Sequence, residues 1–238
     1  MMPRLSAHMT VMHTAAQKAA KRLLRDFNEV ENLQVSVKGP GDFVSQADLR
    51  AEASLREDLE KARPGYALLM EESGASGSEK WAWRWVVDPL DGTTNFLHGI
   101  PHWAISIALE KRLPDGSSEV AAAVVYCPVN NEMFWAEKGV GAYLNDKRLR
   151  VSARRELKDA VFASGIPFAV SSGANRLSFA RTLSTLIPRT SCTLPLTQCG
   201  QGAFCAHASA SLYASLSRAN CSFDVTDVSG CTWKASVR

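Results

Sequence analysis

The spacing of apolar residues along this chain changes close to residue 62 from a helical period to a strand-like one. The spacing predicts helices over residues 6–27 and 45–62, where apolar side chains recur every three or four positions. Beyond them, short apolar runs separated by turn signals such as Asp115-Gly116 and Val129-Asn130-Asn131 predict strands. The expected strands are 66–70, 81–87, 103–110, 119–126, 132–136 and 142–145.

Two helices followed by a meandering antiparallel sheet predict an α+β fold built in layers. A further helix is expected over residues 174–186. The chain has 238 residues, 46% of them apolar, which is typical of a globular protein of one large or two modest domains. No run approaches the roughly 18 apolar residues of a membrane span, and the start lacks the apolar core of a secretory signal. We therefore expect a cytoplasmic location and no membrane partner.

Charge is distributed unevenly, because residues 188–238 hold few charged side chains but five of the six cysteines. The cysteine spacing fits no zinc pattern, and no targeting segment supports disulfides, so reduced thiols are expected. We predict one domain over residues 1–187 and an atypical tail, rich in Cys and Ser, over residues 188–238. The charged residues of the tail are Arg189, Arg218, Asp224, Asp227, Lys234 and Arg238, and its cysteines are Cys192, Cys199, Cys205, Cys221 and Cys231.

Two carboxylates follow the apolar strand 81–87, in the sequence Asp88-Pro89-Leu90-Asp91. Pro89 fixes one backbone angle between them, a geometry that can turn both carboxylates toward one point. Like charges this close repel unless a cation lies between them, and oxygen ligands without His or Cys favour Mg²⁺ or Ca²⁺. If Gly92-Thr93-Thr94 opens a helix, its backbone N–H groups would face an anion beside the metal. The pattern indicates a phosphate-ester site, and an ordinary Asp-Pro turn is the alternative.

The longer string WVVDPLDGTTNFLHGIPHWAISIAL, residues 85–109, resembles the signature of the inositol monophosphatase family of lithium-sensitive, metal-dependent sugar phosphatases. The resemblance continues in the family's order and spacing and covers roughly residues 5–187. Its GTTNF run is similar to the bacterial inositol-1-monophosphatase branch. The resemblance implies a layered α/β sandwich of the sugar-phosphatase type. Its other segments are GDFVSQADLRAEASL (41–55), LLMEESG (68–74) and VVYCPVNNEMFWAEKGVGAYLNDKRLRVS (124–152).

The resemblance implies a metal site of oxygen ligands. In it, Glu71, Asp88 and Asp91 bind through their carboxylates and Leu90 through its backbone carbonyl. The implied cofactor is Mg²⁺ at two or more positions, with inhibition by lithium. Glu71 also belongs to the implied catalytic set.

The resemblance further implies a phosphate site formed by Asp91, Gly92 and Thr93, with Thr94 assisting. Thr93 and Asp48 complete the catalytic set: Asp48 pairs with the Thr93 hydroxyl to orient the attacking water, which is the task of a general base.

The roles of four neighbouring residues are predicted less specifically. Lys38 matches a family position near the phosphate, with a flexible surface lysine as the alternative. Glu72 is expected to be a supporting or solvated group. His98 and His102 are expected to be loop and core residues rather than ligands.

The chain departs from the family pattern in its tail. The family completes its site from a C-terminal α/β half, in which a Trp-Asp pair supplies another metal ligand. None of the six tryptophans here is followed by Asp. We therefore expect this half to be altered or incomplete after about residue 188. Translation in a shifted reading frame is our hypothesis for the loss of charge and gain of Cys and Ser.

Together these features predict a phosphoric monoester hydrolase, dependent on Mg²⁺, that cleaves inositol monophosphate or a similar small polyol phosphate by direct attack of metal-activated water. The resemblance implies a homodimer. A nucleic-acid partner is not expected, because the basic face formed by Lys18, Lys21, Arg22 and Arg25 is typical of a solvated helix. The alternative is a catalytically impaired or non-catalytic family member that acts as a binding or regulatory protein, because the C-terminal metal ligand is missing.

Overall fold

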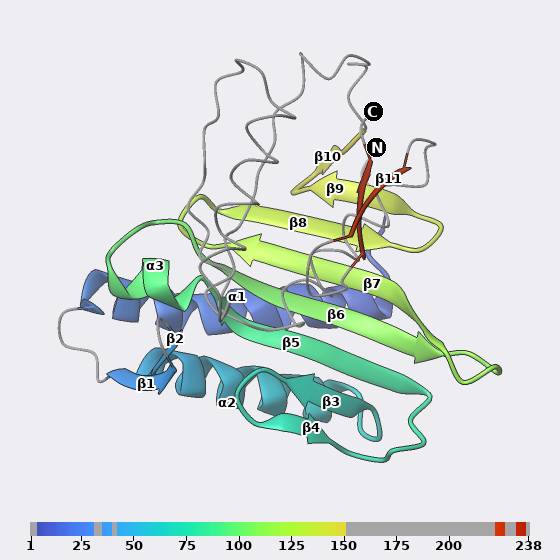
Figure 1. Ribbon diagram of the computed structural model, residues 1–238, viewed down its shortest axis with the longest axis horizontal. Coiled ribbons are helices and arrows are strands. Elements are labelled where there is room, and N and C mark those ends of the chain that lie inside the picture. Colours follow the sequence, from blue (N-terminus) through green and yellow to red (C-terminus); the bar gives the residue numbers. More distant parts are fainter. Residues whose placement is uncertain (1–3, 31–34, 40–41, 151–221, 227–231, 237–238) are drawn as a thin grey trace.

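A single mixed sheet of eight strands, with two long helices on one of its faces, forms the centre of the protein (Figure 1). The computed structural model describes residues 4–30, 35–39, 42–150, 222–226 and 232–236. The strand order is β10-β9-β8-β7-β6-β5-β3-β4. The helices are α1 (Ala7–Asn28), α2 (Gln46–Ala62) and the short α3 (Thr93–Leu97). The strands of the sheet are β3 (Ala67–Met70), β4 (Gly74–Ser76), β5 (Trp83–Asp91), β6 (Ala104–Arg112), β7 (Ser118–Cys127), β8 (Glu132–Glu137), β9 (Gly141–Leu144) and β10 (Lys147–Arg148).

Both long helices begin at a serine that caps the first turn. The Ser6 hydroxyl accepts a hydrogen bond from the Met9 N–H at 3.1 Å, and Ser45 forms a capping box with Asp48. α1 packs beside α2 and covers β6 and β7, while α2 covers β5. Within the described residues, no helix is both long and apolar enough to cross a membrane.

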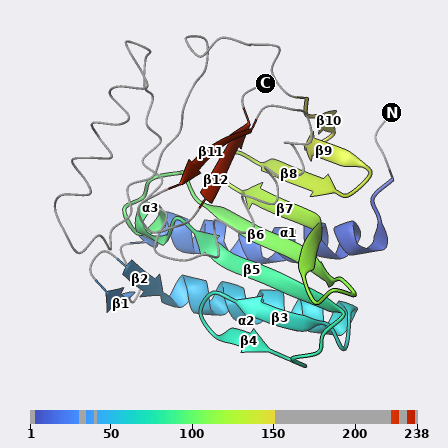
Figure 2. The same cartoon turned by 45° about the vertical axis from the view of Figure 1, so that its right-hand side comes forward.

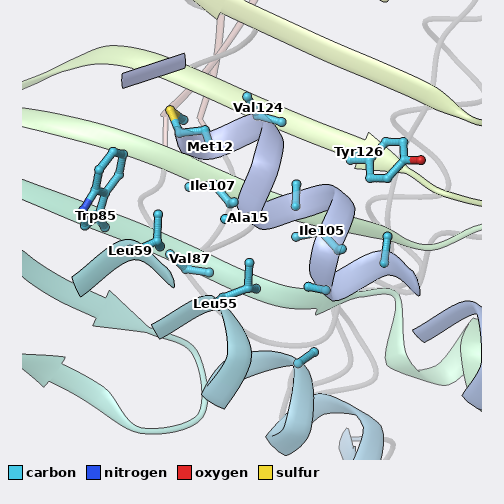
Figure 3. Close-up of a cluster of buried hydrophobic side chains, with 14 of the residues drawn as sticks. Met12, Ala15, Leu55, Leu59, Trp85, Val87, Ile105, Ile107, Val124 and Tyr126 are labelled. Atoms are coloured by element: carbon cyan, nitrogen blue, oxygen red, sulfur yellow. The ribbon is translucent and has the colours of Figure 1, made fainter. Parts of the chain in front are cut away.

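Both faces of the sheet are buried. The face toward the helices carries large side chains such as Trp85, Val87 and Ile107, which pack on α1 and α2 (Figure 3). The opposite face carries a row of small apolar residues that pair in register across five strands and are at most 5% exposed. This alternation is the period-two pattern of a strand, and it fixes which face each site residue occupies. The row consists of Val86, Ala108, Ala123, Ala136 and Ala142.

The layered α+β prediction is confirmed, with differences in detail. β3 and β5 run parallel, because the chain passes through β4 at the sheet edge and returns in its original direction. The loop predicted around residues 38–42 is narrower, since β1 (Val35–Gly39) and β2 (Asp42–Ser45) pair as a hairpin. β11 (Ser222–Thr226) and β12 (Thr232–Ser236) form a separate antiparallel pair (Figure 2). The helix expected over 174–186 lies outside the described residues.

Candidate functional site

The two predicted carboxylates of β5 lie on either side of a break in strand register. Asp88 pairs with Ser106 of β6, Asp91 pairs with Ala104, and the residues between them bulge from the ladder. Proline has no N–H to donate to the ladder, so Pro89 is accommodated at such a bulge. The Leu90 N–H donates to Asp88 Oδ1 at 3.1 Å, which holds the buried Asp88 carboxylate against the bulge. The strand therefore extends to Asp91 rather than ending at Val87.

Glu71 lies beside this bulge because of the parallel pairing of β3 with β5. Met70 is in register with Val87, and the Glu71 N–H donates to the Val87 carbonyl at 3.1 Å. Glu71, which follows the last residue of β3, therefore lies beside the part of β5 where Asp88 begins the bulge. The sequence predicted both residues, and the register brings their backbones together.

Gly92 makes the turn from β5 into α3. Its φ of 88° lies in the left-handed region, and a Cβ at this position would lie 3.1 Å from the His102 carbonyl oxygen. Only glycine satisfies both conditions without strain. The Phe96 N–H donates to the Gly92 carbonyl at 3.0 Å, which confirms the helical opening expected after Asp91.

Thr93, the first residue of α3, contacts Asp48 on α2. Its hydroxyl lies 3.0 Å from Asp48 Oδ1 and 3.1 Å from the Leu90 carbonyl oxygen, and it can donate to either. Asp48 is fully buried, and its other carboxylate oxygen accepts from the Ser45 N–H at 2.9 Å and from the Ser45 hydroxyl. Burial raises the pKa of Asp48 above its usual value, although the hydrogen bonds from Ser45 and Thr93 oppose that rise. The arrangement is a buried carboxylate within hydrogen-bond distance of the Thr93 hydroxyl.

The donors at the end of β5 fit a hard divalent cation in kind. Glu71, Asp88 and Asp91 offer carboxylate oxygens, and Leu90 offers a carbonyl oxygen. Among the residues that the structure describes, however, no three His, Cys, Asp or Glu side chains are gathered closely enough to hold a metal ion. The chemistry of the donors therefore supports a cation, while their side chains do not form a preassembled cage.

The remaining predicted residues lie around α3 and β1. The Thr94 carbonyl contacts His98 Nδ1 at 2.7 Å, and the His98 and His102 side chains are exposed on the loop that follows. Lys38 lies in β1, and its side chain is outside the described residues. Glu72 is half-buried beside Glu71.

The basic residues of α1 form a largely solvated face. Lys18 pairs with Asp58 of α2 at 2.7 Å and is more than half exposed, and the Arg25 side chain donates to the Lys21 carbonyl. These contacts agree with the expectation of a solvated helix face.

Two supporting residues, Ser45 and Glu52, and one nearby thiol, Cys127, were not predicted from the sequence. Ser45 orients Asp48, and the spacing Ser-x-x-Asp of a capping box was the available signal. Glu52 lies one helical turn after Asp48, is 5% exposed, and accepts the Glu72 N–H at 2.9 Å, which anchors the loop that carries Glu71. Cys127 ends β7, where burial, Glu132 and Asp91 raise the pKa of its thiol to about 11, so the thiol is protonated. No local motif in the sequence marks either Glu52 or Cys127.

The chain is similar in sequence to proteins of known families. Residues 5–226 match the inositol monophosphatase family. The inositol-1-monophosphatase of Rhizobium meliloti (strain 1021) is 57% identical over 162 residues, which cover 68% of this chain and 59% of that protein. The Nus factor SuhB of Escherichia coli (strain K12) is 42% identical over 154 residues, which cover 65% of this chain and 56% of that protein.

A solved structure gives the same result for the fold. The crystal structure of the extragenic suppressor protein suhB from Bartonella henselae aligns with a TM-score of 0.72 at 46% identity, covering 86% of this chain and 75% of that one. The chain spans about three fifths of the length of the curated relatives it matches. With its layered fold and the matched residues 5–226, the chain belongs to the inositol monophosphatase family.

Proposed function

We propose that this chain is a Mg²⁺-dependent phosphomonoesterase that hydrolyses inositol monophosphate or a similar small polyol phosphate, works as a homodimer and is inhibited by lithium. The observation that carries the proposal is the hydrogen bond between the Thr93 hydroxyl and buried Asp48, next to the β5 bulge that follows Asp88. Membership of the inositol monophosphatase family supports the reaction class.

In the proposed reaction, a water molecule attacks phosphorus directly, and Thr93 and Asp48 orient it. The Thr93 oxygen accepts a hydrogen bond from the water while its own proton points to Asp48 Oδ1. As the water attacks, its proton passes to Thr93, and the Thr93 proton passes to Asp48. The pKa of Asp48, raised by burial, makes it a better proton acceptor than an exposed aspartate.

The phosphate would lie at the start of α3, held by backbone N–H groups of Gly92 and Thr93, with Asp91 and Thr94 beside them. The first N–H groups of a helix have no partner within the helix, which suits them to an anion. The close approach of Gly92 to the His102 carbonyl fixes the direction of this turn.

The metal would be held by Glu71, Asp88, Asp91 and the Leu90 carbonyl. When bound, a divalent cation lowers the pKa of a coordinated water and stabilises charge on the phosphate and leaving oxygens. The Leu90 N–H contact to Asp88 Oδ1 already fixes one carboxylate of this group.

The test is phosphate release from inositol 1-phosphate by the full chain, with and without Mg²⁺, together with the variant Asp91→Asn. We expect release that depends on Mg²⁺, is reduced by Li⁺ and is lost in Asp91→Asn. If the folded chain releases no phosphate with Mg²⁺, and Asp91→Asn changes nothing, the enzymatic proposal is wrong. Light scattering tests the proposed dimer, which a monomeric mass would contradict.

A second candidate function is supported by a different observation. Several relatives at 40–42% identity bear the name Nus factor SuhB rather than phosphatase. The missing Trp-Asp pair and the lack of a preassembled cage among the described residues also favour a binding or regulatory role. Stable folding without phosphate release, and binding to a transcription factor that persists in Asp91→Asn, would favour this alternative.

We also propose that residues 1–187 form the catalytic unit and that residues 188–238 arise from a shifted reading frame. Charge depletion and cysteine enrichment after Pro188 support this division. The family match extends to residue 226, so the division needs a direct test. Sequencing the coding DNA provides it: a family-like peptide in another frame after codon 188 is expected, and its absence would contradict the hypothesis.

A further inference from the structure

Ser106 carries a buried hydroxyl that satisfies no hydrogen bond. The residue is 2% exposed in the middle of the sheet, and its Oγ has no hydrogen-bond partner among the described residues. Leaving a polar group in this state destabilises the folded protein relative to an apolar side chain of the same shape. Such groups are uncommon in native proteins, and each calls for a reason.

The strand register shows which side chains lie beside Ser106 on the same face of the sheet. On β6, residues two positions away on the same face are Ala104 and Ala108. Across the strands, Ser106 is in register with Val125 of β7 on one side and with Asp88 of β5 on the other. Directly paired residues of antiparallel strands point to the same face, with Cβ atoms about 4.5–5.5 Å apart. Of the four sheet residues beside Ser106 on this face, three are apolar, and Asp88 is the one that carries a polar side chain.

Packing alone does not account for a serine at this position. The adjacent row on the same face uses Ala108 and Ala123, which fill the space between strands without a polar atom. An alanine at 106 would fit the same pattern and remove the cost of the unsatisfied hydroxyl. The hydroxyl therefore lies next to a carboxylate that also accepts a hydrogen bond from the Leu90 N–H on Oδ1.

We propose that Ser106 is a positioning residue for Asp88, whose hydroxyl donates to the Asp88 carboxylate when that carboxylate binds a divalent cation. This inference rests on the metal site of the proposed function. Groups that hydrogen-bond a metal-binding carboxylate orient it, and their removal typically lowers metal affinity 10–100-fold. The Ser106 hydroxyl would then have a hydrogen-bond partner when the cation is bound and none when it is absent, which favours the cation-bound state of Asp88.

The test compares Ser106→Ala, Ser106→Thr and the control Ser118→Ala, which makes the same substitution at an exposed position on β7. Mg²⁺ affinity is measured on the full chain by titration calorimetry, and stability without metal by thermal unfolding. We expect Ser106→Ala to bind Mg²⁺ about 10-fold more weakly and to unfold at an unchanged or higher temperature. Ser106→Thr, which keeps a hydroxyl, should retain most of the affinity, and Ser118→Ala should change neither quantity.

The outcomes separate this inference from the proposed function. If the unaltered chain and Ser106→Ala bind Mg²⁺ equally well, the role of Ser106 is wrong and the metal site stands. If Ser106→Ala loses affinity together with stability, and threonine does not restore it, Ser106 is merely structural. If the unaltered chain binds no Mg²⁺, the proposed function fails and the role of Ser106 fails with it.

Discussion

The Thr93 hydroxyl donates to Asp48 Oδ1 at 3.0 Å and thereby links the start of α3 to the first turn of α2. The two residues are 45 positions apart in the sequence, and Asp48 is fully buried. Asp48 accepts from Ser45 as well, so its carboxylate is held from two sides. Burying a carboxylate costs stability, whereas a carboxylate held in one position is well placed to accept a proton.

Replacing Asp48 by Asn should lower the rate of phosphate release by roughly 10²-fold or more, because the group that receives the proton is lost. Steady-state kinetics with inositol 1-phosphate measures the effect. Asp58→Asn is the matched control: Asp58 lies on the same helix and pairs with Lys18 at the surface, so its loss should leave the rate unchanged. An active Asp48→Asn variant would contradict the role of Asp48.

The same burial predicts a pH dependence for the unaltered chain. The pKa of Asp48 is raised above 3.8 in the folded state, so its proton is bound more tightly there than in the unfolded chain. Protonated Asp48 contributes favourably to stability below pH 3.8. This contribution is lost as the pH rises through the raised pKa of the folded state. Activity should show the opposite trend: it should fall as the pH drops through that same pKa, which lies above the usual value of an aspartate. A pH–rate profile with its acid limb at or below 3.8 would be incompatible with Asp48 as the base.

Gly92→Ala should destabilise the fold and misplace α3. A non-glycine residue in the left-handed region costs about 1–2 kcal/mol, and the added Cβ would also press on the His102 carbonyl at 3.1 Å. Gly99→Ala is the control, since φ is also positive there but a Cβ would meet nothing within 4 Å. Chemical denaturation should show a larger loss for Gly92→Ala than for Gly99→Ala. Equal losses would mean that the contact with His102 is unimportant.

Glu52→Gln should weaken the support of the loop that carries Glu71. The Glu52 carboxylate accepts the Glu72 N–H at 2.9 Å in a setting only 5% exposed, and hydrogen bonds to charged groups contribute about 1.5–3 kcal/mol. We expect weaker Mg²⁺ binding with a modest loss of stability, measured by calorimetry and denaturation. Glu60→Gln, at an exposed position on the same helix, should leave both unchanged. Unaltered Mg²⁺ binding in Glu52→Gln would show that this anchor does not affect the site.

The sequence predicts the helices, most strands and the carboxylates at the end of β5, because each rests on a local period or motif. It does not predict the parallel pairing of β3 with β5, which brings Glu71 beside Val87 through contacts made after the chain has turned at β4. Nor does it predict Glu52 or Ser106. Their importance lies in which backbone N–H or carboxylate they face, and that depends on strand register and helix packing.

His13 provides a test of the helix–sheet packing that is independent of the candidate site. Its ring meets the Trp135 ring edge-on, with centroids 5.9 Å apart, and its buried Nε2 has no hydrogen-bond partner among the described residues. Burial lowers the pKa of His13 below 6.5. At pH values between 6.5 and the lowered pKa, His13 binds a proton in the unfolded chain but not in the folded chain. Stability is therefore full above 6.5 and falls as the pH drops through this window.

His13→Phe keeps the aromatic contact with Trp135 and removes both the unsatisfied nitrogen and the titration. The variant should gain about 1 kcal/mol near pH 7 and lose less stability than the unaltered chain between pH 7 and pH 5. His8, whose pKa burial also lowers, accounts for part of the slope that remains. Urea denaturation at the two pH values measures both quantities, with the exposed His102→Gln as the control. A full pH dependence in His13→Phe would contradict the burial of the His13 ring against Trp135.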